Sequence, residues 1–397
     1  MKNRILVCAE LYFPRGAAGS NLTLCHCKLL KQLGYEVVVI GLKSESDGEY
    51  DESTGLYCYE GIKYTTVKSG KGKLGRINNK LLSATHTIKV LDKLKADKDD
   101  IIMLYSSNGI YMKGINDYAR KKEIKMFSLV VEWHQPYQYP GGKMNIRYIA
   151  NKRGIHIYNP RIGNIVAISK LLDNLFKSKN CHTTIVPVII DYERNKDKYI
   201  ERKLEEGEVK NFIYAGIPFG KDDIVTMLKG IELLSKEERQ KMKFYWIGKE
   251  RDYIEERLGK DSYLLDSISD CLEIRGWMEY NELLKLYEKM DFLYFSKPDN
   301  TVTNALFPSK APEAMLQGLV VVTNSAGDYP DYMIDGEDAF IFDDNTPESC
   351  CDGLRRAINV SNDKLYDMRQ KSFAKAKDIF DYTHWADVMK EFLANLK

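Results

Sequence analysis

Short apolar segments rich in β-branched residues alternate with helical segments along almost the whole chain. In the first half, the predicted strands are residues 4–9, 36–42, 101–105, 126–131, 165–169 and 184–190. In the second half, they are residues 212–215, 243–247, 272–275, 292–295, 319–323 and 339–342. Helical segments fall between several of these strands, and this alternation predicts parallel β-sheets covered by helices on both faces.

The alternation weakens over residues 191–209, which are highly charged and lack a clear strand period. A chain of 397 residues is also too long for one ordinary core. We therefore predict two doubly wound, Rossmann-like α/β domains, residues 1–190 and 191–378, that face each other across a cleft. Residues 379–397 are predicted to contain a helix with one buried face, and packing on the first domain is one option for it.

The net charge of +2 hides two halves of opposite sign. Residues 1–190 contain 29 Lys and Arg against 16 Asp and Glu, a net charge of +13, which leaves −11 for residues 191–397. Either this is ordinary surface composition, or the first half contacts an anionic membrane surface or a lipid phosphate. We expect no nucleic-acid partner, because no recognition motif is present. The basic residues concentrate at Lys68, Lys71, Lys73, Arg76 and Lys80.

No apolar run reaches the roughly 18–20 residues of a membrane span, and the first apolar stretch ends at Glu10, too early for a signal peptide. The sequence therefore predicts a soluble cytoplasmic protein, with peripheral contact at the inner face of the cell membrane as an option. The eight cysteines include no C-x-x-C pair, and Cys25 and Cys27 are two positions apart on a predicted helix. We expect reduced thiols and no metal site.

Glu313 lies among small and apolar residues just before a predicted buried strand. Ser309 as a helix N-cap and Pro312 in the first turn place it near a helix start, at the ligand-binding edge of the second sheet. Either the carboxylate complements the helix dipole, or it accepts hydrogen bonds from two vicinal hydroxyls of a bound sugar ring. The same helix start offers backbone N–H groups to a phosphate.

Two glycine-containing loops follow predicted strands. Gly216 and Lys221 follow residues 212–215, and a lysine there can neutralise a phosphate, although a solvated loop lysine has the same pattern. Gly16 and Gly19 follow the first strand and allow a ligand to approach the backbone, as in many tight turns.

Several segments together resemble family 4 glycosyltransferases of the GT-B fold, of the type that builds bacterial surface polysaccharides. The resemblance implies that a sugar moves from a nucleotide-sugar, a UDP-sugar first among the candidates, to a saccharide or a polyprenyl-diphosphate-linked saccharide. It also implies retention at the anomeric carbon, no cofactor and no metal. The segments are the glycine loop after the first strand, VAISKLLDNLF, YAGIPFGKDD, RGWMEYNELLKLY and, most specifically, residues 305–343.

The resemblance also assigns residues. It implies that Glu313 binds the ribose hydroxyls and that Lys221 contacts the diphosphate. It also implies that Gly19 belongs to the loop that closes over the diphosphate. His134 resembles the family histidine that contacts the donor sugar, although an ordinary packed loop is the alternative, and Glu132 is a further candidate. His134, Lys221 and Glu313 are the predicted catalytic residues. The implied donor site also contains Gly16, Gly216, Arg275, Trp277, Met278, Asn304, Phe307, Pro308, Ser309 and Lys310.

The sequence departs from the family pattern in two places. The family commonly has a glutamate eight positions before the ribose glutamate, where this chain has Ala305. The family often has an arginine a few residues before Lys221, where Ile217 and Pro218 stand here. The sugar, the donor pose and the acceptor therefore stay open. Two other functions stay open as well, a nucleotide-sugar epimerase and a non-catalytic nucleotide-sugar-binding partner of another transferase.

Overall fold

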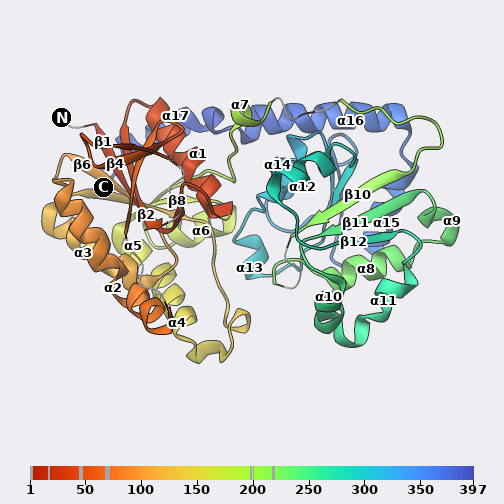
Figure 1. Cartoon of the computed structure of the whole chain (residues 1–397), viewed down its shortest axis with the longest axis horizontal. Coiled ribbons are helices and arrows are strands. Elements are labelled where there is room, and N and C mark those ends of the chain that lie inside the picture. Colours follow the sequence, from red (N-terminus) through yellow and green to blue (C-terminus); the bar gives the residue numbers. More distant parts are fainter. Residues whose placement is uncertain are drawn as a thin grey trace. The chain divides into compact units, whose positions relative to one another are not determined.

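The structure, a computed structural model, describes residues 3–16, 18–43, 48–67, 72–196, 199, 201–216 and 220–397. The chain divides into two compact units (Figure 1). Lys68, Lys71, Ile217 and Pro218, singled out from the sequence, lie outside the described residues. Unit 1 comprises Met1–Ile190, Ala305–Phe307 and Tyr382–Lys397, and unit 2 comprises Asp191–Asn304 and Pro308–Asp381.

Unit 1 is built on a sheet that has, among the described residues, nine strands in the order β3-β4-β5-β2-β1-β6-β7-β8-β9. Pairing is parallel from β5 to β9, with Val7 of β1 opposite Val39 of β2 and Met103 of β6. At the other edge, β3, β4 and β5 pair antiparallel. The strands are β1 (Arg4–Phe13), β2 (Glu36–Lys43), β3 (Glu49–Asp51), β4 (Leu56–Tyr59), β5 (Ile62–Val67), β6 (Asp100–Tyr105), β7 (Lys125–Val130), β8 (Asn164–Ala167) and β9 (His182–Ile185).

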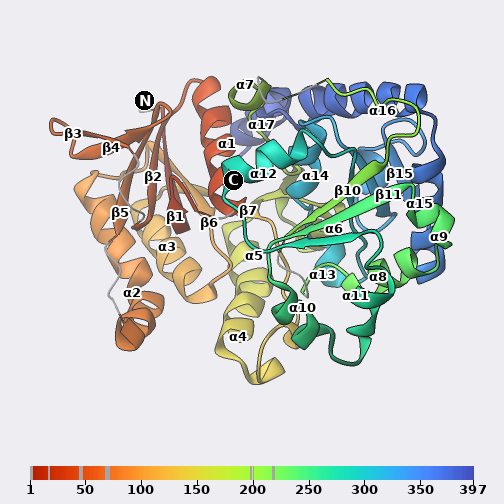
Figure 2. The same ribbon diagram turned by 45° about the vertical axis from the view of Figure 1, so that its right-hand side comes forward.

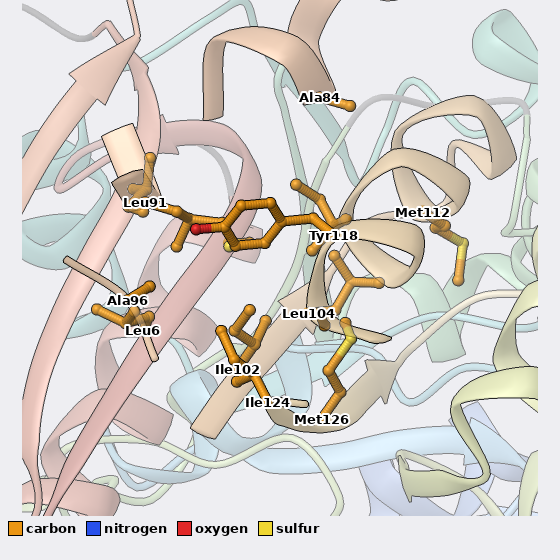
Figure 3. Packing of buried hydrophobic residues seen from close by; sticks show 14 of the residues in the cluster. Leu6, Ala84, Leu91, Ala96, Ile102, Leu104, Met112, Tyr118, Ile124 and Met126 are labelled. Carbon is orange, nitrogen blue, oxygen red and sulfur yellow. The ribbon is translucent and has the colours of Figure 1, made fainter. Parts of the chain in front are cut away.

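Helices cover this sheet. α2 and α3 contact each other, and their apolar side chains meet those of β1, β6 and β7 in a buried core that includes Leu91, Leu104 and Tyr118 (Figure 3). α1 packs against β1 and β2 and is followed by Gly34, whose φ of +89° ends the helix. The helices are α1 (Ala18–Gln32), α2 (Gly72–Lys93), α3 (Gly109–Lys122), η1 (Pro136–Gln138), η2 (Gly142–Met144), α4 (Ile146–Arg153), η3 (Gly154–Tyr158), α5 (Asn159–Ile162), α6 (Lys170–Lys177), η8 (Tyr382–Trp385) and α17 (Ala386–Ala394).

The C-terminal helix α17 is part of unit 1. Phe392 is buried and stacks on His182 with ring centroids 4.8 Å apart, and it meets Phe127 edge-on at 5.7 Å. Lys125 Nζ donates to the carbonyl oxygen of Leu396 at 2.9 Å. Strands β7 and β9 therefore hold the end of the chain through both apolar and polar contacts.

Unit 2 is built on a sheet with, in the described part of the chain, six parallel strands in the order β12-β11-β10-β13-β14-β15. Phe212 and Phe292 stack across β10 and β13 with ring centroids 4.6 Å apart. The strands are β10 (Lys210–Ala215), β11 (Met242–Ile247), β12 (Leu272–Arg275), β13 (Phe292–Tyr294), β14 (Val320–Asn324) and β15 (Ala339–Phe342).

Helices of unit 2 lie on both sides of its sheet. α14 and α16 lie above the strands in Figure 1, and α8 and α11 lie below them. α15 packs against α8 and along β14 and β15 (Figure 2). None of the described helices has the length and hydropathy that crossing a bilayer requires. The helices are α7 (Tyr192–Asn195), α8 (Ile224–Glu232), α9 (Lys236–Arg239), α10 (Arg251–Leu258), η5 (Gly259–Asp261), α11 (Tyr263–Ser267), α12 (Tyr280–Tyr287), α13 (Thr301–Asn304), α14 (Lys310–Met315), η6 (Tyr329–Asp331), α15 (Pro347–Asn359), α16 (Asn362–Lys375) and η7 (Ala376–Phe380).

Candidate functional site

Three neighbouring strands of unit 2 are each followed at once by a glycine. Gly216, Gly248 and Gly276 follow β10, β11 and β12, and Gly248 N donates to the carbonyl oxygen of Gly276 at 2.9 Å. A Cβ atom on Gly248, whose φ is +130°, would lie 2.4 Å from the carbonyl oxygen of Gly216. The strand ends therefore come this close only because no side chain separates them. Sequence reasoning identified Gly216 but missed Gly248, for which a glycine directly after a predicted strand was the available signal.

A buried charged cluster lies beside this edge and is called here the Asp222 cluster; its members are Tyr214, Asp222, Lys297 and Lys310. Asp222 accepts hydrogen bonds from Lys297 Nζ at 2.6 Å, Lys310 Nζ at 2.7 Å and the Tyr214 hydroxyl at 2.8 Å. Lys310 Nζ also lies 4.2 Å from the centre of the Tyr214 ring. Only 2% of the Lys297 side chain, 7% of Asp222 and 18% of Lys310 are exposed.

The cluster contains two ammonium groups and one carboxylate. Burial opposes the charged form of Asp222, but Lys310 and Lys297 outweigh burial and hold the pKa of that carboxyl well below its usual value. Burial lowers the pKa of Lys297 to about 8, although Asp222 acts in the opposite direction. With both lysines protonated the cluster carries one unbalanced positive charge, which suits an anionic ligand.

The side chain of Asn324 fixes the backbone of Lys297, which lies three residues beyond the end of β13. Asn324 accepts from Lys297 N at 2.9 Å and donates to the Lys297 carbonyl oxygen at 2.8 Å. Lys297 Nζ also donates to the carbonyl oxygen of Lys221 at 3.2 Å. The structure thus ties the backbone of the predicted Lys221 to the cluster, while the Lys221 side chain is exposed. Sequence reasoning missed Asp222 and Lys297, because their burial depends on residues distant in the chain.

The predicted ribose residue, Glu313, is half-buried in the first turn of α14. Ser309 does not cap this helix as expected: it has helical φ and ψ, and its side chain makes no cap hydrogen bond. The cap prediction failed because Ser309 already continues the chain into the turn, and its carbonyl oxygen accepts from Glu313 N at 3.3 Å. Lys310, at the start of α14, faces Asp222 instead of solvent.

The other donor-site candidates of unit 2 have different surroundings. Arg275 is 2.5 Å from Glu273 and lies over the Tyr245 ring, so its guanidinium is engaged within the sheet. Trp277 is 71% exposed, and Met278 is half-buried. Asn304 Nδ2 donates to Asp299 at 2.7 Å. Pro308 is half-buried in unit 2, whereas Phe307 is buried and, like Ala305, belongs to unit 1.

In unit 1, His134 and Glu132 follow β7, and His134 Nε2 lies 2.8 Å from Glu132 Oε2. Gly16 and Gly19 lie around the start of α1. A Cβ atom on Gly19 would lie 2.9 Å from the Tyr105 hydroxyl, so this glycine has a packing reason independent of any ligand. The packing of Tyr105 against the start of α1 could not be read from the loop sequence.

No group of three or more His, Cys, Asp or Glu side chains in the described part of the chain is arranged to hold a metal ion. Cys25 and Cys27 are buried cysteines of α1. His26 between them is also buried, and burial lowers the pKa of its imidazole to about 3.

Residues 210–359 match the protein family described as "Glycosyl transferases group 1". This segment contains the three glycines, the whole Asp222 cluster and α14. Among curated protein sequences, none matches the chain.

Solved structures resemble the chain over nearly its whole length. HepE from Anabaena in complex with UDP and glucose is 12% identical, with 99% of this chain and 100% of that chain covered and a TM-score of 0.66. Sucrose-phosphate synthase from Thermosynechococcus elongatus is 10% identical, with 98% of each chain covered and a TM-score of 0.68. A structure from E. coli described as trehalose-6-phosphate bound with UDP-2-fluoro glucose is 10% identical, with 99% of each chain covered and a TM-score of 0.71. At these identities the similarity concerns the fold, and the predicted GT-B fold is confirmed.

Proposed function

We propose that this chain is a glycosyltransferase that transfers a sugar from a UDP-sugar and binds the donor diphosphate at the Asp222 cluster. The observation that carries the proposal is that the buried Lys297 and the half-buried Lys310 share one carboxylate at the carboxyl ends of parallel strands. The family match over residues 210–359 supports it. So do the descriptions of similar structures, which name UDP and UDP-2-fluoro glucose as bound molecules.

The cluster suits the chemistry of this transfer. When the bond between the sugar and the diphosphate breaks, negative charge develops on the leaving phosphate oxygen. Lys297 and Lys310 are already positioned by Asp222, so they stabilise that charge without reorganising. Because two ammonium groups supply the positive charge, we propose that the reaction needs no metal and that chelator leaves its rate unchanged.

The remaining roles follow the resemblance. We propose that Glu313 binds the ribose, that Arg275, Trp277 and Met278 lie beside the base, and that Lys221 adds positive charge for the diphosphate. Gly16, Gly19, Gly216, Asn304, Phe307, Pro308, Ser309 and His134 complete the donor site in this proposal. The products would be saccharides of the bacterial surface-polysaccharide type, formed with retention as in family 4, at the inner face of the membrane.

Turnover tests the proposal. The chain is incubated with UDP-glucose, UDP-galactose and UDP-N-acetylglucosamine, with and without saccharide acceptors, and released UDP is measured. We expect acceptor-dependent release with at least one donor, and at least a tenfold lower rate for Lys310→Met. Lys371→Met, at an exposed lysine paired with Glu337, is the matched control and should keep the wild-type rate. Epimerised donor without transfer, or equal rates for both variants, would contradict the proposal.

A further inference from the structure

A surface of unit 1 between β7 and β8 combines exposed apolar side chains with positive charge. Residues 133–172, which contain this surface, include six Lys or Arg and no Asp or Glu. Within them, α4 lies at the lower end of unit 1 in Figures 1 and 2. The exposed side chains of α4 and of the two short helical turns before it are called here the α4 surface; they are Tyr137, Lys143, Met144, Ile146, Arg147, Ile149, Lys152 and Arg153.

The apolar side chains of this surface are unusually exposed. Met144, Ile146 and Tyr137, at 88%, 67% and 66%, are three of the four most exposed large apolar side chains that the structure describes. The backbone around them is held in place, because Asn145 caps α4 by accepting from Arg147 N at 2.9 Å. These side chains therefore extend from a capped turn that presents them to the surroundings of the protein.

On α4 the apolar residues form a stripe between cations. At about 100° per residue, Ile146 and Ile149 are neighbours on one side of the helix. Arg147 flanks this stripe on one side and Lys152 on the other. The helix packs on α3 and η3, and its buried residue, Asn151, lies roughly opposite the two isoleucines. The stripe therefore points away from the fold, and packing within unit 1 does not account for it.

The cations of the α4 surface lack carboxylate partners. Among the described residues, none of its four Lys and Arg side chains forms an ion pair with Asp or Glu. Exposed lysines elsewhere in unit 1 are paired, as Lys63 is with Glu36 and Lys113 is with Asp117. Four unpaired positive charges around apolar side chains complement a partner that is both anionic and apolar.

We infer that the α4 surface docks this chain on a bilayer that contains anionic lipids. Met144, Ile146 and Ile149 enter the boundary between headgroups and acyl chains, and the cations beside them contact lipid phosphates. A bilayer fits better than a folded protein, because the centre of a protein interface is depleted of charged residues. The inference rests on the proposed function in one respect: an acceptor carried on a lipid diphosphate lies in such a bilayer.

Sedimentation of the full chain with vesicles tests this inference. The vesicles contain phosphatidylcholine alone or phosphatidylcholine with an equal part of phosphatidylglycerol. We expect binding to the anionic vesicles, at least about tenfold weaker binding to the neutral ones, and release at about 1 M salt. Lys143→Gln/Arg147→Gln should bind anionic vesicles roughly 30-fold more weakly, because each cation near such a surface contributes about fivefold. Met144→Ser/Ile146→Ser should lose at least about tenfold through its apolar contacts.

Two matched variants are the controls. Lys63→Gln/Lys113→Gln removes two charges from exposed, paired lysines of unit 1. Ile334→Ser replaces an isoleucine of unit 2 that is 52% exposed. Both should bind anionic vesicles as wild type does, and an equal loss in the controls would overturn the inference. Melting temperatures confirm folding, and if one α4-surface variant does not fold, the other decides.

Three further outcomes would overturn the inference. They are a wild type that does not bind anionic vesicles, a folded α4-surface variant that binds them as wild type does, and a wild-type dimer without vesicle binding that Met144→Ser/Ile146→Ser dissociates. The last result would identify the surface as an interface between copies of this chain.

UDP binding, measured on the same samples, separates this inference from the proposed function. If UDP binds while vesicles do not, the docking surface is overturned and the proposed donor site stands. If vesicles bind with the expected losses while UDP does not, the docking surface is supported and the donor proposal fails.

Discussion

At the scale of single residues, Lys297 is the most informative group in the molecule. It is an almost fully buried lysine, and such a group is costly unless it is paired. Asp222 supplies the pairing, yet burial still lowers the pKa of Lys297 to about 8. Folding lowers this pKa from 10.5 to about 8. Below pH 8 the lysine is protonated in both the folded and the unfolded state, so the full cost of burying its charge reduces the stability of the fold. As pH rises from about 8 to 10.5, the folded state binds fewer protons than the unfolded state, and this cost is relieved.

The same shift predicts a pH dependence of UDP binding. The protonated form of Lys297 attracts the diphosphate, so we expect the affinity for UDP to fall as pH rises through about 8. In Lys297→Met the affinity should be lower at neutral pH and nearly constant from pH 7 to 9.5. Isothermal titration at several pH values measures both. An equally steep decline in the variant would assign the effect to another group.

The next prediction concerns the proposed hydrogen bonds between the Glu313 carboxylate and the ribose hydroxyls. A carboxylate that accepts two hydroxyl hydrogen bonds contributes about 1.5–3 kcal/mol per bond. Glu313→Ala should therefore bind UDP more weakly, by roughly tenfold to a hundredfold for each of the two hydrogen bonds that is lost. Wild type should prefer UDP to 2′-deoxy-UDP, whereas the variant should bind both alike. A preference that survives the substitution would place the ribose elsewhere.

At the scale of elements, the buried parallel strands could be predicted because they form short apolar runs between helices. The antiparallel edge from β3 to β5 was missed, since its strands are short and polar residues interrupt them. Strand ends were also uncertain: β1 continues to Phe13, and β9 spans His182–Ile185 where residues 184–190 were expected. Lys310 could be assigned from its motif, but the pairing of Asp222 with Lys297 joins separate segments and has no local signal.

The glycines that follow β10, β11 and β12 give a prediction about the stability of unit 2. Gly248→Ala places a Cβ atom 2.4 Å from the carbonyl oxygen of Gly216, at a φ of +130°. We expect a loss of about 1–3 kcal/mol in the free energy of unfolding, because the strand ends must separate. Gly220→Ala is the matched control, since a Cβ atom there meets nothing within 4 Å. Chemical denaturation compares the two, and equal stabilities would mean that the edge tolerates a side chain.

At the scale of the whole molecule, the chain folds as two units, and its last segment belongs to the first of them. Phe392 is one of the buried apolar residues of α17 and contacts the rings of His182 and Phe127. Phe392→Ala should lower the free energy of unfolding of unit 1 by about 3–5 kcal/mol. Glu391→Ala, at an exposed position of the same helix, should have little effect. Hydrogen exchange should locate the loss of protection in β7 and β9 of unit 1, and uniform loss over both units would contradict this assignment.

The account depends most on the Asp222 cluster as the diphosphate site, and the affinities of UDP and uridine measured side by side test it most directly. Each lysine contributes a charge-assisted bond worth about 1.5–3 kcal/mol. Wild type should therefore bind UDP at least a hundredfold more tightly than uridine. Replacement of both Lys297 and Lys310 by methionine should remove most of that difference and leave uridine binding unchanged. A double variant that keeps the wild-type ratio, or that loses both ligands equally, would show that the diphosphate is bound elsewhere.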